Sequence, residues 1–422
     1  MDFLEELRWR GLLHDATPGL EEALAEGPMT AYVGFDPTAD SLHIGNLIPV
    51  MLLLHWQRAG GRPIALVGGA TGRVGDPSGK TAERQLLDVA TIEHNLACQQ
   101  AQLERFLHFE GPNAARVVNN YDWFQHMGFL DFIRDVGKHI TVNYMLAKDS
   151  VKNRLEHGMS FTEFSYQLIQ GYDFYHLWKH HGVRVQMGGS DQWGNITTGT
   201  ELIRRLGGGQ AFAVTAPLVT KSDGTKFGKS EGGNVWIDRT KTSAYAFHQY
   251  WLNVADADAA RFLRFFTLLD RAEIEALERE HEADPGSRRM QRALADDITR
   301  RVHGEDALAT ARAAAQILFG ASTRDTLESL SVAELEEVFQ GVPTYHVDRV
   351  ALAAGMPVVD LLTSGFLASR SEARRALGEG SIQINKTPVR SEDHRITSHD
   401  LIASRLMVVQ RGKKSFALVY VT

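Results

Sequence analysis

The sequence has very little cysteine and no long apolar segment. Cys98 is the only cysteine among 422 residues, and no apolar run approaches the roughly 18 residues that a membrane-spanning helix needs. A single thiol excludes an intramolecular disulfide framework and a cysteine-based zinc site, which fits a reducing compartment. Residues 1–10 are acidic and amphipathic, unlike a signal peptide. We therefore expect a cytoplasmic protein without a membrane partner.

The composition is that of an ordinary globular protein, with 43% hydrophobic and 23% charged residues. The length predicts two or three domains. The net charge of -7 for the whole chain gives no sign of a nucleic-acid partner, but the charge is unevenly distributed along the sequence. Residues 351–422 carry ten Lys and Arg against six Asp and Glu, a net charge of +4, so the remainder carries -11. This asymmetry predicts a basic C-terminal module on an acidic body.

Four short apolar runs, each followed by small or polar residues, predict buried strands: TAYVGFDPT, PIALVGGATG, ARVVNNYD and VRVQMGGSDQWGN. Helical patterns such as residues 47–59 and 91–109 lie between them. This alternation predicts an α/β fold with a doubly wound, Rossmann-like parallel sheet. Ligands of such sheets bind beyond the carboxyl ends of the strands. Asp36, Asp76, Asn120 and Asp191 follow the four runs and predict a pocket there, although Asp and Asn also simply favour loops.

The pattern changes along the rest of the chain. We expect residues 1–220 to form the α/β domain and residues 221–325 to form a loop followed by a helical domain, because long amphipathic patterns such as DAARFLRFFTLLD replace the strand signals. Residues 326–350 are acidic and could be a linker or an extension. Residues 351–422 predict a small α+β domain.

Two segments of the α/β part suit phosphate chemistry. GFDPTADSLHIGNL leads from the first strand into a helix expected to begin near His43, and a helix N-terminus offers free N–H groups to phosphate. Gly45 would let a flat group lie against the backbone. The loop KSDGTKFGKSEGG, residues 221–233, contains three lysines and four glycines. Taken separately, these segments are better explained as a capped surface helix and a solvated turn.

Together, HIGN and KFGKS resemble the paired signatures His-Ile-Gly-His and Lys-Met-Ser-Lys-Ser of class I aminoacyl-tRNA synthetases. More specifically, YVGFDPTADSLHIGN, GDPSGK, NNYDW, SYQLIQGYDF, GGSDQWGN and KFGKS occur in the order and spacing of the bacterial tyrosyl-tRNA synthetase family, and the resemblance extends over the whole chain. It implies a ligase that activates L-tyrosine with ATP, releases pyrophosphate, and transfers tyrosine to the 3′-terminal adenosine of tRNA(Tyr). It also implies Mg²⁺ bound with ATP, no resident metal site, a homodimer, and an anticodon-side position for the helical domain within residues 221–325.

The resemblance implies two sets of residues around ATP. The catalytic set comprises Thr38, His43, Asn46, Lys80, Arg84, Lys226, Lys229 and Ser230, and the ATP-binding set comprises Gly34, Asp36, Gly45, Gly189, Asp191, Lys226 and Lys229. The lysines of KFGKS would neutralise the triphosphate, while Lys80 and Arg84 would hold pyrophosphate or else be plain surface charges. GDPSGKT ends like a P-loop, but Val74 occupies the position where that motif needs glycine.

The tyrosine site rests partly on helical spacing. Tyr166, Gln170 and Asp173 are spaced i, i+4 and i+7 in a largely apolar helix, so they form one stripe that more plausibly lines a pocket than faces water. By resemblance, tyrosine would contact Tyr32, Asp76, Asn120, Tyr166, Gln170, Asp173 and Gln192. Tyr32 and Asp173 would meet the phenol, and polar groups left unpaired by phenylalanine would reject it without an editing domain.

The tail resembles a small RNA-binding module first described in a ribosomal protein. Its expected tRNA contacts are Arg370, Arg374, Arg375, Lys413 and Lys414. An ordinary charged surface is the alternative. Asn46 replaces the second histidine of the first signature but can still donate through its amide. Three rival functions are a tryptophan enzyme of the same class, an RNA-binding protein that has lost catalysis, and a tRNA-modifying enzyme with the same kind of tail.

Overall fold

The computed structural model describes residues 2–78, 85–155, 157–224, 227–230, 233–319, 323–339, 342–412 and 415–422. The chain forms two compact units. The first comprises the residues up to Asp238 together with Trp251–Val302, and the second comprises Arg239–Tyr250 and His303–Thr422. None of the described helices is both long and apolar enough to cross a membrane.

A six-stranded sheet forms the centre of the first unit, in the order β1-β6-β5-β2-β3-β4. Its strands are β1 (Asp15–Ala16), β2 (Thr30–Phe35), β3 (Arg62–Val67), β4 (Arg116–Asn119), β5 (Val183–Gly189) and β6 (Phe212–Ala216). All neighbours pair in parallel except β1, which is antiparallel to β6. The chain runs outward from β2 to β4 and then returns to β5, so the winding direction reverses between β2 and β5. The four predicted strands are confirmed, whereas β1 and β6 were not predicted.

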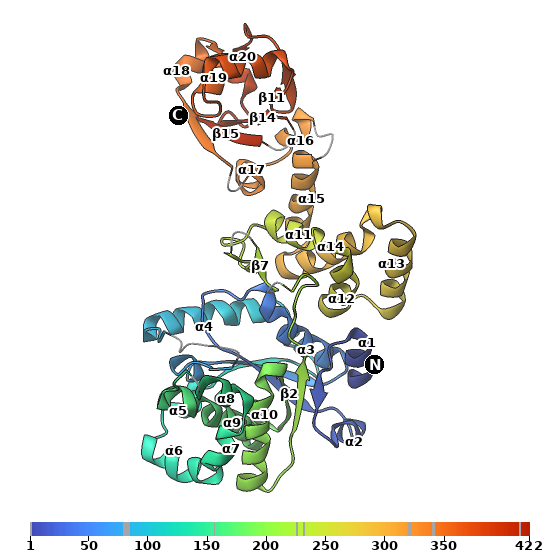
Figure 1. The fold of residues 1–422 in the computed structure, drawn as a ribbon, viewed down its shortest axis with the longest axis vertical. Helices are drawn as coiled ribbons and strands as arrows, with labels where there is room; N and C mark the ends of the chain where they lie inside the picture. Colours follow the sequence, from blue (N-terminus) through green and yellow to red (C-terminus); the bar gives the residue numbers. More distant parts are fainter. Residues whose placement is uncertain are drawn as a thin grey trace. The chain divides into compact units, whose positions relative to one another are not determined.

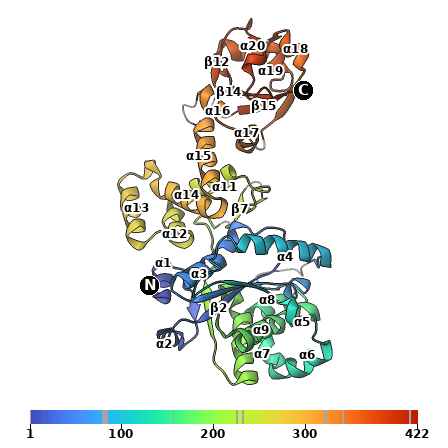
Figure 2. The same cartoon turned by 180° about the vertical axis from the view of Figure 1, so that it is seen from behind.

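Helices cover both faces of this sheet, which confirms the predicted doubly wound class. Helices α3 (Leu47–Arg58) and α4 (Val89–Leu103) lie on one face, and α9 (Phe161–His181) and α10 (Trp193–Leu202) lie on the other (Figures 1 and 2). Helices α1 (Phe3–Arg10) and α2 (Leu20–Ala25) precede β2. Side chains from the sheet and from α9 and α10 share one core cluster that includes Tyr32, Phe174 and Ile196.

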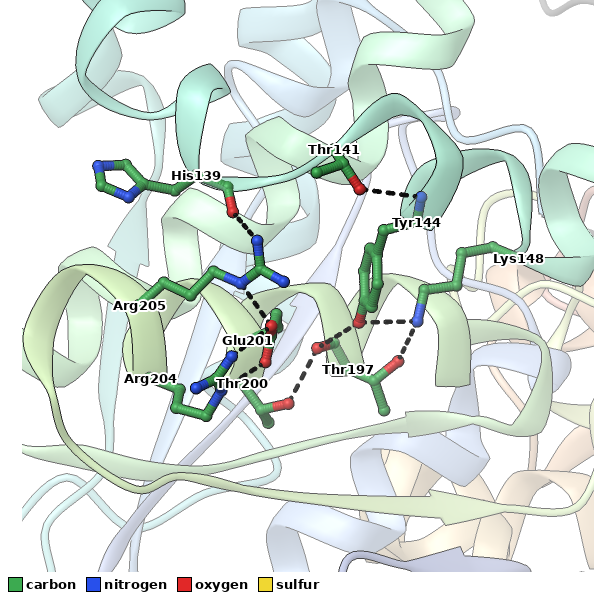
Figure 3. A network of polar contacts seen from close by, with 9 residues as sticks. All are labelled: His139, Thr141, Tyr144, Lys148, Thr197, Thr200, Glu201, Arg204 and Arg205. Carbon is green, nitrogen blue, oxygen red and sulfur yellow. Dashed lines mark hydrogen bonds and ion pairs between the residues drawn. The ribbon is translucent and has the colours of Figure 1, made fainter.

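Four short helices connect β4 to α9: α5 (Tyr121–Phe124), α6 (Phe129–Asp135), α7 (Val142–Leu146) and α8 (Asp149–Leu155). Figure 3 shows how this segment is fixed to α10. The Lys148 ammonium donates to Thr197 Oγ1 and to the Tyr144 hydroxyl, both at 2.9 Å, and that hydroxyl donates to the Thr197 carbonyl at 3.2 Å. Arg205, beyond the end of α10, donates to the His139 carbonyl at 2.8 Å.

After β6 the first unit continues with a short hairpin of β7 (Lys229–Ser230) and β8 (Gly233–Asn234), and then becomes helical, as predicted. The helices are α11 (Ala244–Leu252), α12 (Asp256–Phe266), α13 (Arg271–Ala283) and α14 (Arg289–His303), of which α11 and α14 cross the boundaries between the two units. A strong apolar stripe on α12, with buried Phe262, Leu263 and Phe266, explains why this amphipathic segment forms a packed helix.

The second unit adds α15 (Glu305–Phe319), α16 (Arg324–Glu328) and α17 (Val332–Val338) before a five-stranded sheet in the order β12-β11-β14-β15-β9. The strands are β9 (Thr344–Val347), β11 (Ile382–Ile384), β12 (Thr387–Val389), β14 (Leu406–Arg411) and β15 (Ser415–Val421). Helices α18 (Arg349–Ala353), α19 (Val358–Thr363) and α20 (Arg370–Gly378), and the short pair β10 (Met356–Pro357) and β13 (Arg395–Ile396), complete it. Residues 326–350, for which a linker or an extension was expected, contribute β9, which pairs in parallel with β15.

Candidate active site

A cavity of about 490 Å³ lies where the winding of the first sheet reverses, at the carboxyl ends of β2 and β5. Its wall includes fourteen of the sequence-predicted residues: Tyr32, Gly34, Asp36, Thr38, His43, Gly45, Asn46, Asp76, Tyr166, Gln170, Asp173, Gly189, Asp191 and Gln192. The stripe on α9 therefore faces the cavity, as its spacing predicted. The fold brings together residues separated by more than 150 positions in the sequence.

Several other predicted residues are placed differently. Lys80, Arg84, Lys226, Lys413 and Lys414 lie outside the described residues, and only the backbone of Lys229 and Ser230 is described. Asn120 is not part of the cavity wall but is fully buried behind it. Its amide nitrogen donates to Asp173 Oδ2 and to Thr71 Oγ1, both at 3.0 Å, so Asn120 contacts residues of the wall instead of the cavity itself.

One part of the cavity combines a buried carboxyl group with a buried hydroxyl. Asp173 accepts hydrogen bonds from Asn120 and, at 2.9 Å, from Trp123 Nε1. Burial raises the pKa of Asp173 to about 8, an effect that these two hydrogen bonds oppose. The Tyr32 hydroxyl is buried without a partner among the described residues, and so is Gln186 Oε1. Burial, and then the charge of Asp173, raise the Tyr32 pKa. This arrangement suits a ligand group that both donates and accepts, such as a hydroxyl.

A second part of the cavity is rich in acceptors. Asp36 accepts from the Tyr166 hydroxyl at 2.8 Å and from Thr71 Oγ1 at 2.7 Å. Asp76 accepts from Gln192 Nε2 at 2.7 Å. Burial, followed by the charges of Asp36 and Asp76, raises the Tyr166 pKa, so its hydroxyl stays protonated. Two carboxylates at one wall of a cavity favour a cationic ligand group.

The first signature differs in one detail from the expected helix start. His43 caps a 3₁₀ turn, Ile44–Asn46, and α3 begins only at Leu47. His43 Nδ1 accepts from the Gly45 N–H at 3.0 Å, so Nε2 is the ring nitrogen that can donate. Asn46 Oδ1 accepts the His43 N–H at 3.0 Å, which leaves its amide nitrogen to donate. A Cβ on residue 45 would lie 2.7 Å from His43 Cε1, so glycine is required there by this ring.

The described part of the second signature lies against the first. Gly228 has φ +92°, and a Cβ placed on it would be 3.6 Å from the Gly45 nitrogen. The Gly228 carbonyl accepts from Val235 N–H at 3.1 Å, and the Val235 carbonyl accepts from Ile44 N–H at 3.0 Å. Phe227 is only 8% exposed and packs in an aromatic cluster with Trp251. This part of the lysine-rich loop is therefore packed, which excludes a fully solvated turn.

Comparison with known families identifies the family of the chain. Residues 24–320 match the family model described as tRNA synthetases class I (W and Y). The chain belongs to this family. Residues 334–419 match a second model, described as the tyrosine–tRNA ligase SYY-like C-terminal domain. Together the two matches cover both the α/β and helical part and the C-terminal sheet domain of this class I synthetase.

Individual relatives agree with the family match. A protein named tyrosine–tRNA ligase from Porphyromonas gingivalis is 55% identical over 429 residues, covering 100% of both chains. Another of that name from Bacteroides fragilis is 55% identical over 427 residues, covering 99% of both chains. Among solved structures, a C-terminally truncated mitochondrial tyrosyl-tRNA synthetase from Aspergillus nidulans superimposes with a TM-score of 0.67 at 32% identity, covering 73% of this chain and 92% of that one.

Some residues of the synthetase cavity were not predicted. Trp123 lies within the motif NNYDW, but its hydrogen bond to Asp173 spans 50 positions, and nothing in the local pattern signals it. Trp123 itself is not part of the cavity wall, whereas Thr71 and Gln186, which were not predicted either, belong to it. The loop after β6, residues 217–219, adds an apolar surface that includes Leu218, which is 59% exposed. Because strand β6 was not predicted, the loop that follows it was not expected at the carboxyl edge of the sheet.

The predicted tRNA-contacting arginines lie on α20 in the second unit, and each has a carboxylate partner. Arg370 pairs with Asp360 at 2.7 Å. Arg374 pairs with Glu392 at 2.9 Å, and Arg375 approaches Glu379 at 4.0 Å. The three arginine side chains are more than half exposed. Such surface pairs contribute only about 0–1 kcal/mol to stability.

Proposed function

We propose that this synthetase is a tyrosine–tRNA ligase. A tyrosine carboxylate oxygen attacks the α-phosphorus of ATP, the bond to the β-phosphate breaks, and pyrophosphate leaves. A ribose hydroxyl of the 3′-terminal adenosine of tRNA(Tyr) then attacks the tyrosyl carbonyl, and AMP leaves. The presence of Asp173 and Tyr32 on the wall of the same buried part of the cavity carries this proposal, because a phenol can donate to the first and accept from the second.

The ammonium and carboxylate groups of tyrosine fit the acceptor-rich part of the cavity, which contains Asp36 and Asp76. Asp76 would meet the ammonium group, and Tyr166 would help, since its hydroxyl donates to Asp36 and keeps a lone pair for the ligand. Gln170 lies next to Gln192, because its Nε2 donates to Gln192 Oε1 at 3.4 Å. Gln192 would contact the carboxylate of tyrosine. Asn120 would act on tyrosine through Asp173, which it holds from behind.

ATP fits the side of the cavity that carries the two signatures. His43 and Asn46 would donate to phosphate oxygens, and Thr38 lies on the same wall. Asp191 would accept from a ribose hydroxyl, with Gly34 and Gly189 allowing close approach, while Leu218 offers an apolar face to the base. Preorganised donors and cations at the developing charge are the main source of catalysis in such transfers. No covalent enzyme intermediate is required.

The remaining predicted cations act on the triphosphate in this proposal. Lys226 and Lys229, with Ser230, would stabilise charge on the phosphates, and Lys80 and Arg84 would hold the leaving pyrophosphate. Mg²⁺ would be bound by triphosphate oxygens, because the described residues contain no group of three or more His, Cys, Asp or Glu side chains that could hold the ion by themselves. When bound, the ion would neutralise part of the phosphate charge.

We also propose a homodimer in the cytoplasm, with the domain division expected from the sequence except that β9, within residues 326–350, belongs to the C-terminal sheet domain. An apolar face on the segment after β4 supports the dimer: Phe129, Val142 and Phe161 are 65%, 60% and 63% exposed and line a cavity of about 630 Å³. Apolar patches of this kind mark protein contacts. Val142→Asp should yield monomers in sedimentation, whereas Val350→Asp, at a 74% exposed position of the second unit, should not. A Val142→Asp variant that remains dimeric would move the interface elsewhere.

The deciding experiment is amino-acid-dependent exchange of labelled pyrophosphate into ATP without tRNA. Exchange with tyrosine alone would support both the adenylate chemistry and the phenol site. Exchange with tryptophan would transfer the assignment to the other specificity of this family. A folded sample that exchanges with no amino acid would refute the proposed activity and favour an RNA-binding protein.

A further inference from the structure

Helix α4 presents a stripe of buried carboxamides. Asn95, Gln99 and Gln102 are spaced i, i+4 and i+7, so they share one face of the helix, and they are 4%, 2% and 7% exposed. Burying a primary amide without a hydrogen bond is costly. Three of them on one face of a helix therefore need a polar structure opposite. The adenylate mechanism proposed above uses none of the three.

The structure opposite is the segment that joins β2 to the first signature. Residues 36–42 form neither helix nor strand, so their backbone groups need partners from elsewhere. Asn95 Nδ2 donates to the Pro37 carbonyl at 3.0 Å. Gln99 Nε2 donates to the Ala39 carbonyl at 3.0 Å and, more weakly, to the Asp36 carbonyl at 3.4 Å.

Gln102 holds the end of the same segment with both of its polar atoms. Its Oε1 accepts the Leu42 N–H at 2.8 Å, and its Nε2 donates to Ser41 Oγ at 3.1 Å. The next residue is His43, whose backbone and ring are fixed by Asn46 and Gly45. The amides of α4 thus contact the backbone or side chains at five of the seven positions from residue 36 to residue 42.

We propose that Asn95, Gln99 and Gln102 are positioning residues for adenylate formation. This inference rests on the proposed function. They fix the backbone of residues 36–42 and thereby place Thr38 and His43, which both line the cavity, against the triphosphate. Contacts that must be aligned in the transition state respond strongly to small displacements, and about 1 Å costs on the order of 100-fold in rate. None of the residues assigned to tyrosine above lies within residues 36–42, so the affinity for tyrosine should depend little on these amides.

Substitution of single amides tests this role. Gln99→Met and Gln102→Met keep the length of the side chain but remove its hydrogen bonds. Gln100→Met is the matched control, because Gln100 is exposed on the same helix and donates to Glu104 Oε1 at 2.9 Å. We expect kcat of tyrosine-dependent pyrophosphate exchange to fall about 10-fold or more in the first two variants. The tyrosine Kd should stay within about 2-fold, and the control should match the wild type within about 2-fold.

Two further readouts separate positioning from a structural role. Titration of the active sites measures how much adenylate forms per mole of chain and so gives the fraction of competent molecules. Dividing the exchange rate by this fraction gives kcat per competent site. The melting temperature reports the stability of the fold. A loss confined to the melting temperature or to the competent fraction, with kcat per site unchanged in both variants, would overturn the inference. Tyrosine affinity that falls in parallel with kcat would also overturn it. Absence of exchange in the wild-type chain would refute the proposed function and this inference together.

Discussion

The ring of Phe227 stacks on the ring of Phe266, with 5.2 Å between centroids and 11° between planes. Phe227 belongs to the KFGKS signature, and Phe266 is the last residue of α12. Phe262 meets the Phe227 ring edge-on at 5.1 Å. The stem of the same loop is held on α12 as well, because the Asp258 carboxylate accepts from the backbone N–H and the hydroxyl of Ser222. Helix α12 therefore anchors the second signature, and Val235 links Gly228 to the first, because its N–H donates to the Gly228 carbonyl and its carbonyl accepts from the Ile44 N–H.

The first prediction concerns this aromatic anchor. Phe227→Ala removes the stacked ring and frees the loop from α12, so groups that act only in the transition state lose their alignment. We expect kcat of pyrophosphate exchange to fall by about 10-fold to 100-fold and the tyrosine Kd to change less than about 2-fold. Phe227→Met fills much of the same space and should retain most of the activity. Equal losses of tyrosine affinity and kcat in Phe227→Ala would contradict an anchoring role.

The second prediction concerns Asp173 and pH. In the folded chain the pKa of the Asp173 carboxyl group is raised to about 8, so this group keeps its proton up to about that pH. An aspartate in the unfolded chain releases its proton near pH 4. Between these values the unfolded state binds fewer protons than the native state, so the stability due to this group is complete below about pH 4 and is lost as pH rises to about 8.

Asp173→Asn cannot ionise and isolates this contribution. We expect the melting temperature of the wild type, relative to that of Asp173→Asn, to fall by several degrees between pH 5 and pH 9, measured without ligands. Other titrating groups cancel in the difference. A difference that stays constant across this pH range would mean that Asp173 is already ionised in the folded chain at pH 5.

The outcome for Asp173 illustrates how much the sequence could predict. Its place in the cavity followed from helical spacing with Tyr166 and Gln170, because α9 is regular and buried on that side. Its partner Trp123 could not be predicted, since a hydrogen bond across 50 positions has no periodic signal. The two signatures were found as motifs, but the 3₁₀ turn after His43 depends on local hydrogen bonds that the sequence pattern does not specify.

The third prediction concerns recognition of the phenol. Tyr32→Phe removes a buried hydroxyl that has no protein partner in the described part of the chain, so the fold loses no internal hydrogen bond. We expect a melting temperature close to that of the wild type. Without the hydrogen bond to this hydroxyl, the binding free energy of tyrosine would be weaker by about 1 kcal/mol, which corresponds to a KM for tyrosine about five times higher. The preference for tyrosine over phenylalanine should fall by a similar factor, measured as the ratio of kcat/KM in pyrophosphate exchange. An unchanged ratio would remove Tyr32 from the phenol site.

The fourth prediction concerns the arginines of α20. Arg370, Arg374 and Arg375 would contact tRNA phosphates, so replacing all three with glutamine should weaken tRNA binding and reduce its dependence on salt concentration. Pyrophosphate exchange needs no tRNA and should be unchanged, and the salt bridges lost to Asp360 and Glu392 are exposed and cost little stability. The matched control replaces the exposed residues Arg8, Arg62 and Arg105 of the α/β part with glutamine, which removes the same charge elsewhere. If the α20 variant and the control lose tRNA affinity equally, the effect comes from net charge, and α20 is not the tRNA contact.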